Sequence, residues 1–387
     1  MPASAKSWRA TAVSSTRSVA DQTAWIESLS PWPEEFGLGR MRDLLARLGD
    51  PQKSFSAVHV VGTNGKTTTT RMCAALLAGA GKTVGAYTSP HVTAWSERIQ
   101  LGGGPVDLEG ALARVRPAAD ALRATQFEAL TAAALAEFRA AGVEVAVVEA
   151  GLGGRLDATN VLDARVVVLT NVDLEHTEVL GETREQIARE KLAVIRPGAV
   201  AVLGEPEWEG LARESGAEAV VVTGRSNLAL AVAAAESFLG APVDSEPAES
   251  TVVPGRLERV GEEPLEIWDG AHNLAGVGYV LARLPARGYV VVASILEDKD
   301  AERMLAALGA LGDVFVATQS TNSRALPVRH LAETAARFFG RVEVDPDPVA
   351  ARERARQLAG KEGAVLVTGS LYLLADLASV RPQAPVP

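Results

Sequence analysis

The stretch that most constrains the fold runs from Ala57 to Pro90 and reads AVHVVGTNGKTTTTRMCAALLAGAGKTVGAYTSP. A short β-branched run is followed by a turn of Gly and Asn, a lysine with hydroxyl residues, an Ala/Leu stretch and a second short apolar run. Gly62 and Gly65 allow a tight turn after the first run, so that backbone N–H groups converge at the start of a helix. The stretch therefore predicts a strand, an anion-binding loop, a helix and a strand.

The side chains of this loop suit a nucleoside triphosphate. Lys66 supplies a positive charge for the outer phosphates, and Thr67 or Thr68 supplies a hydroxyl for Mg²⁺. The two glycines stand closer together than in the common phosphate loop, and an ordinary glycine-rich turn is the alternative. We expect a phosphate loop, because Gly-Lys-Thr stands directly between a strand and an Ala/Leu helix. Its residues are Gly62, Thr63, Asn64, Gly65, Lys66, Thr67 and Thr68.

Length and composition exclude several classes of protein. At 387 residues the chain is expected to hold about two or three domains. A formal charge of -10 without a basic block argues against a nucleic-acid protein, and no apolar run is long enough to cross a membrane. The single cysteine, Cys73, permits no internal disulfide and fits a cytoplasmic protein.

Hydrophobic patterning predicts an α/β protein: a P-loop doubly wound parallel-sheet domain followed by a smaller Rossmann-like α/β domain. Helical spacing is found at 24–48, 107–123 and 127–141, with a polar loop at 88–104 before the last two. Strand-like runs that are apolar on both faces follow, as in buried parallel sheets. The expected divisions are a flexible tail at 1–23, an ATP-binding domain at 24–240, a linker at 241–264, a C-terminal ligase domain at 265–380 and a flexible tail at 381–387.

Polar side chains follow several of the predicted strands. Ligands bind beyond the carboxyl ends of strands in open parallel sheets, so these positions are candidates for a site. Glu149 ends one strand and is placed to hold Mg²⁺ directly or through water, with a capping or solvent-facing role as the alternative. His91, His176 and His272 each follow a strand. Three imidazoles at one rim favour a site over three structural histidines.

The linker and the start of the second domain carry PGRLE at 254–258 and WDGAHN at 268–273. If the two domains face one another, these segments enter the cleft opposite the triphosphate. The residues that would project there are Arg256, Asp269, His272 and Asn273. The alternative is a helix N-cap made by Asp269 or Asn273, which is compatible with ligand contact.

Short motifs follow one another in the order GTNGKT, TSPH, FEALT, EAGLGGRLDATN, HTEVLG, REKLA, PGRLE, DGAHN, EDKD, RALP and GSLYLL. From about residue 25 to residue 377, they resemble the folylpolyglutamate synthase and dihydrofolate synthase group of the Mur ligase family. The resemblance implies an ADP-forming ligase that joins the α-amine of L-glutamate to a carboxylate of folate or dihydropteroate. It also implies a monomer, and the composition predicts no nucleic-acid or membrane partner.

The resemblance also implies roles for individual residues. ATP and Mg²⁺ are the expected cofactors, and a second divalent or monovalent cation is left open. Ser89, Glu149 and His176 correspond to the family's magnesium ligands, to which Thr67 adds the loop hydroxyl. Lys191 matches a lysine that is carbamylated, although by pattern alone it is a helix-surface lysine. Asn227 matches a residue that contacts adenine, Arg256 and Asp269 match contacts to the nucleotide phosphates, and His272 is similar to a residue near the phosphates and the incoming glutamate. The implied catalytic residues are Lys66, Lys191, Asp269 and His272.

One departure keeps other functions open. The folate enzymes usually carry Gly and Ser after the loop lysine, whereas this chain has Thr67 and Thr68. In this respect it resembles the cell-wall Mur ligases. A Mur-type ligase of a cell-wall precursor is therefore an alternative, although it normally needs a further N-terminal domain and only about 55 residues precede this loop. A non-catalytic phosphate-loop protein is a second alternative, but it would not need the DGAHN segment. The sequence leaves open whether the product is dihydrofolate, a longer polyglutamate tail or both.

Overall fold

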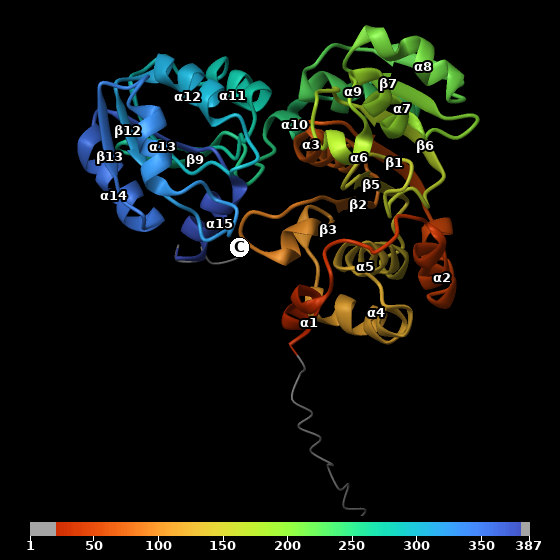
Figure 1. The fold of residues 1–387 in the computed structure, drawn as a ribbon. Helices are drawn as coiled ribbons and strands as arrows, with labels where there is room; N and C mark the ends of the chain where they lie inside the picture. Colours follow the sequence, from red (N-terminus) through yellow and green to blue (C-terminus); the bar gives the residue numbers. More distant parts are fainter. Residues whose placement is uncertain (1–20, 381–387) are drawn as a thin grey trace, which may run out of the picture.

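The computed structural model describes residues 21–380, which form two α/β lobes (Figure 1). The first lobe contains β1 (Ser56–Val61), β2 (Val84–Tyr87), β3 (Ile99–Leu101), β4 (Gly104–Pro105), β5 (Val145–Glu149), β6 (Ala164–Leu169), β7 (Val200–Leu203) and β8 (Ala219–Val222). Its helices are α1 (Gln22–Ser28), α2 (Gly39–Arg47), α3 (Lys66–Gly79), α4 (Leu108–Leu122), α5 (Gln126–Ala140), α6 (Thr177–Leu180), α7 (Arg184–Leu192), α8 (Glu209–Glu214), α9 (Asn227–Leu239) and α10 (Glu246–Glu249), with 3₁₀ turns at Pro51–Lys53, Trp95–Arg98 and Pro206–Trp208.

The second lobe contains β9 (Glu258–Glu262), β10 (Leu265–Trp268), β11 (Tyr289–Ala293), β12 (Val314–Ala317), β13 (Arg341–Val344) and β14 (Ala364–Thr368). Its helices are α11 (Leu274–Leu281), α12 (Ala301–Leu308), α13 (Val328–Ala335), α14 (Pro348–Ala359) and α15 (Leu371–Ser379), with a 3₁₀ turn at Gly309–Leu311. The two lobes confirm the predicted α/β class.

The first sheet has the strand order β4-β3-β2-β5-β1-β6-β7-β8 and is parallel from β2 to β8. β1 lies between β5 and β6, and the sheet extends from β1 in both directions. The loop after β1 is therefore at the point where the strand order reverses, which is where doubly wound sheets bind ligands. β3 and β4 add an antiparallel edge. The expectation of a polar loop through 88–104 is therefore wrong from Ile99 onward, because these strands are too short for an alternating pattern to reveal them.

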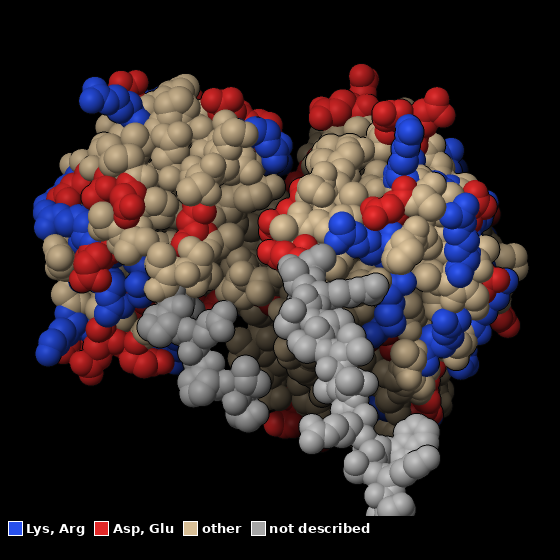
Figure 2. All heavy atoms as spheres, turned by 90° about the horizontal axis from the view of Figure 1, so that it is seen from below, with Lys and Arg blue, Asp and Glu red and all other residues tan. Residues whose placement is uncertain are grey.

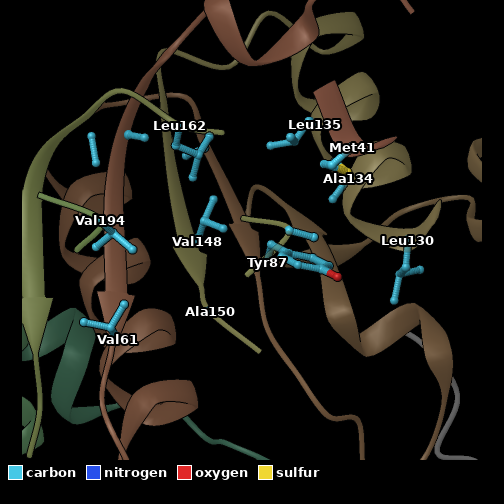
Figure 3. Close-up of a cluster of buried hydrophobic side chains, with 14 of the residues drawn as sticks. Met41, Val61, Tyr87, Leu130, Ala134, Leu135, Val148, Ala150, Leu162 and Val194 are labelled. Atoms are coloured by element: carbon cyan, nitrogen blue, oxygen red, sulfur yellow. The ribbon is translucent and has the colours of Figure 1, made fainter. Parts of the chain in front are cut away.

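The central strand β1 is buried on both faces of the sheet. Val58 and Val60 pack toward α3 and α9, whereas Val61 packs in the core on the opposite face, beneath α5 and α7. Figure 3 shows that second core, with Tyr87 of β2 near Leu130 of α5. Successive side chains of a strand point to opposite faces of the sheet, so a strand covered on both faces needs a continuous apolar run. Such runs are the pattern from which the parallel strands were predicted.

The second sheet has the order β13-β12-β11-β14-β10-β9, and β9 alone is antiparallel to its neighbour. The β9–β10 hairpin brings Glu258–Glu262 into this sheet, and α10 also falls within the segment expected to be a linker at 241–264. That segment is thus partly regular structure. β9 lies at the edge of the sheet and is only half-buried, so its sequence needs no continuous apolar run. The prolines and acidic residues of this segment therefore gave no sign of a strand.

The lobes touch through apolar as well as polar side chains. Val92, which follows β2 in the first lobe, is buried against Trp268 and Leu374 of the second. Figure 2 shows a furrow between the lobes, and acidic and basic side chains are interspersed on both. None of the helices within residues 21–380 combines the length and apolar character needed to cross a membrane. The expected tails lie outside the described residues, except that α1 begins at Gln22.

Candidate active site

The loop between β1 and α3 requires glycine at two positions. Gly62 has φ +147°, and a Cβ there would lie 1.9 Å from Thr170 Oγ1. Gly65, with φ +81°, is the N-cap of α3, and a Cβ there would lie 2.4 Å from Asn227 Oδ1. A side chain at either position would clash and strain the backbone. The loop therefore keeps an open helix N-terminus, the feature that binds phosphate.

The loop is held against the end of β6. Asn171 Oδ1 accepts a hydrogen bond from Asn64 N at 3.0 Å, and Asn171 Nδ2 donates to Asn64 O at 3.1 Å. Asp173 N donates to Thr63 Oγ1 at 3.1 Å. These bonds span more than 100 residues of sequence. They preorganise the anion-binding loop before any ligand arrives.

Two lysines converge on the loop. Lys66 Nζ donates to Thr63 O at 3.1 Å, and Lys191 Nζ donates to Gly62 O at 2.8 Å. Lys191 is 4% exposed, so the pattern-based expectation of a helix-surface lysine is wrong. Burial, together with the charge of Lys66, lowers the pKa of Lys191 to about 7. A substantial share of this amine is therefore neutral at neutral pH.

Glu149, at the end of β5, accepts two hydrogen bonds beside Lys66. Thr67 Oγ1 donates to Glu149 Oε1 at 3.0 Å, and Ser89 N donates to Glu149 Oε2 at 3.0 Å. Burial raises the pKa of Glu149, while the charge of Lys66 opposes this effect. Buried carboxylate and hydroxyl oxygens are donors that suit a hard cation such as Mg²⁺. Within residues 21–380, no three His, Cys, Asp or Glu side chains already form a metal cluster.

The three candidate histidines do not share one position. His176 and His272 both lie close to Glu175, whereas His91 Nδ1 accepts from Arg98 Nε at 2.9 Å and its ring packs against Trp95 at an interplanar angle of 52°. His91 is thus partnered by the 3₁₀ turn Trp95–Arg98, whereas Glu175 is the neighbour of the other two, and the expectation that His91 joins them at one rim stays a prediction.

His176 is the N-cap of α6 and has the left-handed conformation, with φ +51°. Burial lowers its pKa, and the positive charges of Lys299, Lys66 and Lys191 act in the same direction. The neutral imidazole is the form that binds metals. No contact between His176 and Glu149 is present, so the structure groups Thr67 and Ser89, but not His176, around that carboxylate.

The DGAHN segment of the second lobe reaches the phosphate loop. Asn273 Nδ2 donates to Asn64 Oδ1 at 3.1 Å, and Tyr279 OH accepts from Asn227 Nδ2 at 3.3 Å. His272 Nε2 lies 3.5 Å from Glu175 Oε1. The cleft therefore brings together residues of both lobes.

Asp269 organises the second-lobe side of the cleft. Its carboxylate accepts from Leu257 N and Ala271 N, both at 2.8 Å. Burial raises the pKa of Asp269, whereas the charge of the neighbouring Arg256 opposes the shift. Asn273 Oδ1 caps α11 through Gly276 N at 2.8 Å. Capping and contact across the cleft thus coexist, as the sequence allowed.

Glu175 and Lys299 were missed as site residues. Glu175 Oε1 lies 3.7 Å from Lys299 Nζ, so this pair joins the two lobes. The only sequence signals were an acidic residue beside His176 and the EDKD motif, to which no role had been attached. Neither signal shows that residues 124 positions apart meet, because that contact depends on how the lobes are placed.

Two family models match the chain. The Mur ligase middle domain matches residues 60–239, and the Mur ligase glutamate ligase domain matches residues 255–371. The first match contains the phosphate loop and Lys191, and the second contains the DGAHN segment and Lys299. Together they cover both sides of the cleft.

Relatives and solved structures match nearly the whole chain. A dihydrofolate synthase/folylpolyglutamate synthase of Bacillus subtilis is 32% identical over 92% of this chain and 97% of its own length. The structure of Escherichia coli FolC in complex with DHPP and ADP has a TM-score of 0.83 at 31% identity, covering 94% of this chain and 97% of that one. A bifunctional folylpolyglutamate synthase/dihydrofolate synthase with Mn, AMPPNP and L-glutamate bound has a TM-score of 0.82 at 30% identity, covering 93% of this chain and 97% of that one.

Proposed function

The chain belongs to the Mur ligase family, and from that premise we propose that it is an ATP-dependent ligase that adds L-glutamate to a folate or dihydropteroate carboxylate. One observation carries the proposal: Asn273, in the DGAHN segment of the second lobe, contacts Asn64 in the phosphate loop of the first. A two-lobed cleft can hold the triphosphate on one side and present the incoming amino acid from the other.

The first chemical step activates the acceptor. A carboxylate oxygen of the acceptor attacks the γ-phosphorus of ATP, and the bond from that phosphorus to the β,γ-bridging oxygen breaks. ADP is the leaving group, and the acceptor becomes an acyl phosphate. Negative charge on the transferring group is stabilised by Lys66 and by the N–H groups at the start of α3. Lys66 lies in the loop itself and bonds to Thr63 O, which supports this role.

Glu149 and Thr67 are the residues that we propose to hold Mg²⁺, with Ser89 beside them, and His176 stays a predicted ligand. When bound, the cation would neutralise charge on the phosphate oxygens. Structures of relatives were solved with ADP, or with Mn and AMPPNP, and support ATP and a divalent cation as the cofactors.

The second step forms the amide. The neutral α-amine of glutamate attacks the acyl carbon, inorganic phosphate leaves, and the nitrogen loses a proton. Water would hydrolyse the acyl phosphate, so positioning across a closing cleft accounts for much of the rate. His272 and Asp269 line the second-lobe side, Asn227 and Arg256 are the proposed adenine and phosphate contacts, and Lys191 is proposed to carry a carbamate.

The names of the relatives support a folate acceptor over the cell-wall alternative, and the two-lobed cleft supports a ligase over a non-catalytic nucleotide-binding protein. The relatives are described as both dihydrofolate and folylpolyglutamate synthases, so both acceptors belong in the assay. The monomeric state and the cytoplasmic setting stay predictions.

The test is phosphate release from ATP and Mg²⁺ with glutamate and either dihydropteroate or a folate, each component being omitted in turn. We expect release to require both organic substrates and to fall at least about 100-fold in Lys66→Ala, the order expected when a charge-stabilising group is lost. Lys53→Ala removes an exposed lysine and is the matched control. Phosphate release that ignores glutamate and pterin, or near-normal turnover in Lys66→Ala, would contradict the proposal.

A further inference from the structure

A buried carboxylate just after β7 connects two loops of the first lobe. Glu205 follows β7 by two positions and is 4% exposed. Its Oε2 accepts from Val172 N and from Trp208 Nε1, both at 2.8 Å. Its Oε1 accepts from Arg184 Nη2 at 2.9 Å and also from Arg225 Nη2. The four donors come from separate segments, so this one carboxylate sets how those segments lie relative to one another.

One of these segments supports the phosphate loop. Asn171 O accepts from Thr63 N at 3.0 Å, in addition to the side-chain contacts of Asn171 described above. The next residue, Val172, is held at both ends: its N–H donates to Glu205, and its carbonyl oxygen accepts from Arg184 Nε at 2.8 Å. Hydrogen bonds to charged groups are stronger than those between neutral groups. Glu205 and Arg184 therefore stabilise the position of the segment on which the phosphate loop rests.

A second segment leads into α9. Arg225 directly precedes Ser226, the N-cap of α9, and Asn227, the proposed adenine contact. Asn227 Oδ1 lies beside Gly65 of the phosphate loop, where a Cβ would approach it to 2.4 Å. The side chain of Arg225 is 56% exposed, so its ion pair with Glu205 ties a surface loop to a buried residue. The start of α9 is thus held at a set distance from the phosphate loop.

We propose that Glu205 is a positioning residue for the nucleotide. Through Arg184 it fixes the segment that supports the phosphate loop, and through Arg225 it fixes the loop that presents Asn227 to adenine. The inference rests on the proposed function. Glu205 acts through the two loops rather than by contact with the nucleotide, and it sets the distance between the phosphate and adenine subsites. Loops that are ordered before binding lower the entropic cost of binding.

The two arginines predict different losses of binding. Arg225→Met releases the loop on the adenine side, so we expect ADP to bind about five- to tenfold more weakly, while inorganic tripolyphosphate binds within about twofold of wild type. Arg184→Met releases the segment that supports the phosphate loop, and both ligands should bind about tenfold more weakly. Glu205→Gln can still accept from Val172 N, but it presents N–H groups to both arginines, so it should weaken both ligands as well.

The measurement is calorimetric titration of each protein with ADP or with tripolyphosphate, both in the presence of Mg²⁺. Arg213→Met is the matched control for Arg225→Met, because Arg213 is 54% exposed and pairs with Glu209 on the surface of α8. Thermal melts accompany each titration. Arg225 is more than half exposed, so its variant tests the proposal even if Glu205→Gln does not fold. A merely structural role would not separate the two ligands.

Unchanged ADP affinity in Arg225→Met would overturn the proposal. Equal weakening of ADP and tripolyphosphate in that variant would overturn it as well, because the loss would then reflect charge or stability rather than placement of the adenine loop. A loss confined to ADP in Arg184→Met would contradict the role assigned to the segment below the phosphate loop. If the wild-type protein does not bind ADP at all, the proposed function fails instead, so the two failures are distinguishable.

Discussion

Asn273 in the second lobe donates its side-chain amide to Asn64 Oδ1 in the phosphate loop, 3.1 Å away, while its own Oδ1 caps α11. One side chain therefore fixes the start of a helix and couples that helix to the nucleotide-binding loop of the other lobe. Because Asn64 is itself bonded to Asn171 and Asp173, the contact connects the second lobe to the carboxyl end of β6.

Asn273→Asp separates these two roles. The carboxylate still caps α11, but it cannot donate to Asn64 Oδ1 and repels it instead, so we expect nearly unchanged thermal stability and about a tenfold lower kcat/KM for ATP. Thermal melts and steady-state kinetics measure the two effects. Asn273→Ala is the comparison. It should lose about 1 kcal/mol of unfolding free energy through the missing cap, and it should also show the lower kcat/KM for ATP. Unchanged kinetics in Asn273→Asp would show that the contact has no functional role.

Gly65→Ala tests the geometry of the phosphate loop. The added Cβ would lie 2.4 Å from Asn227 Oδ1 at a φ of +81°, so we expect strain of about 1 kcal/mol or more and at least tenfold weaker ADP binding. Calorimetric titration with ADP and Mg²⁺ measures the change. Gly39→Ala is the control, because nothing lies within 4 Å of a Cβ there. Equal ADP affinities in the two variants would argue against this loop as the nucleotide site.

Lys191 is expected to form a carbamate in a pH-dependent manner. Carbon dioxide reacts with the neutral amine, and burial lowers the pKa of Lys191 to about 7, so the neutral form increases as the pH rises from 6 to 8. After incubation with ¹³C-bicarbonate, NMR should show a carbamate signal that grows over this range. Lys191→Arg should lack the signal, whereas Lys53→Arg, at an exposed position, should keep it. Persistence of the signal in Lys191→Arg would assign it to another amine.

His59 makes stability depend on pH in acid. Burial lowers the pKa of His59 to about 3, below the value of about 6.5 in the unfolded chain, so between these values only the unfolded state takes up the proton. Stability is therefore lost as the pH falls below about 6.5, by about 2 kcal/mol at pH 5 from this group. Glu149 and Asp157 are present in both the wild type and His59→Gln, so their contribution to the pH dependence of stability is shared. The difference between the two proteins therefore reports the contribution of His59.

Urea unfolding at pH 7 and pH 5 provides the measurement for His59. The stability advantage of the wild type over His59→Gln should shrink by about 2 kcal/mol at the lower pH. His330→Gln, at an exposed position, should follow the wild type at both values. If the stability difference between wild type and His59→Gln does not change with pH, His59 has the same protonation state in the folded and unfolded chain, and the prediction is wrong.

Local features of the chain were readable without the structure. The phosphate loop is one contiguous segment whose conformation depends on its own glycines, and β1 and β5 are apolar on both faces because helices cover both sides of the sheet. Glu149 was found for the same reason, since a residue that ends an apolar strand of a parallel sheet lies at the ligand-binding edge.

Short or half-exposed elements were not readable. The strands β3, β4 and β9 have too few residues, or too little burial, to produce an alternating pattern. His91 followed the same sequence rule as His176, yet its partner is Arg98, in the 3₁₀ turn that precedes β3. A position after a strand indicates the edge of the sheet at which a side chain lies, but not the partner that it meets there.

The sequence alone determined the longer buried strands and helices, the anion-binding loop and the polar residues at the ends of those strands, because each depends on neighbours within a few positions. Only the tertiary structure decided that Lys191 is buried against Gly62 and that Glu175 meets Lys299 across the cleft. These contacts join segments more than 100 residues apart, and the lowered pKa of Lys191 and the ion pair of Glu175 and Lys299 arise from burial and charge at those contacts. Such electrostatics follow from the packing of the two lobes, which no local pattern encodes.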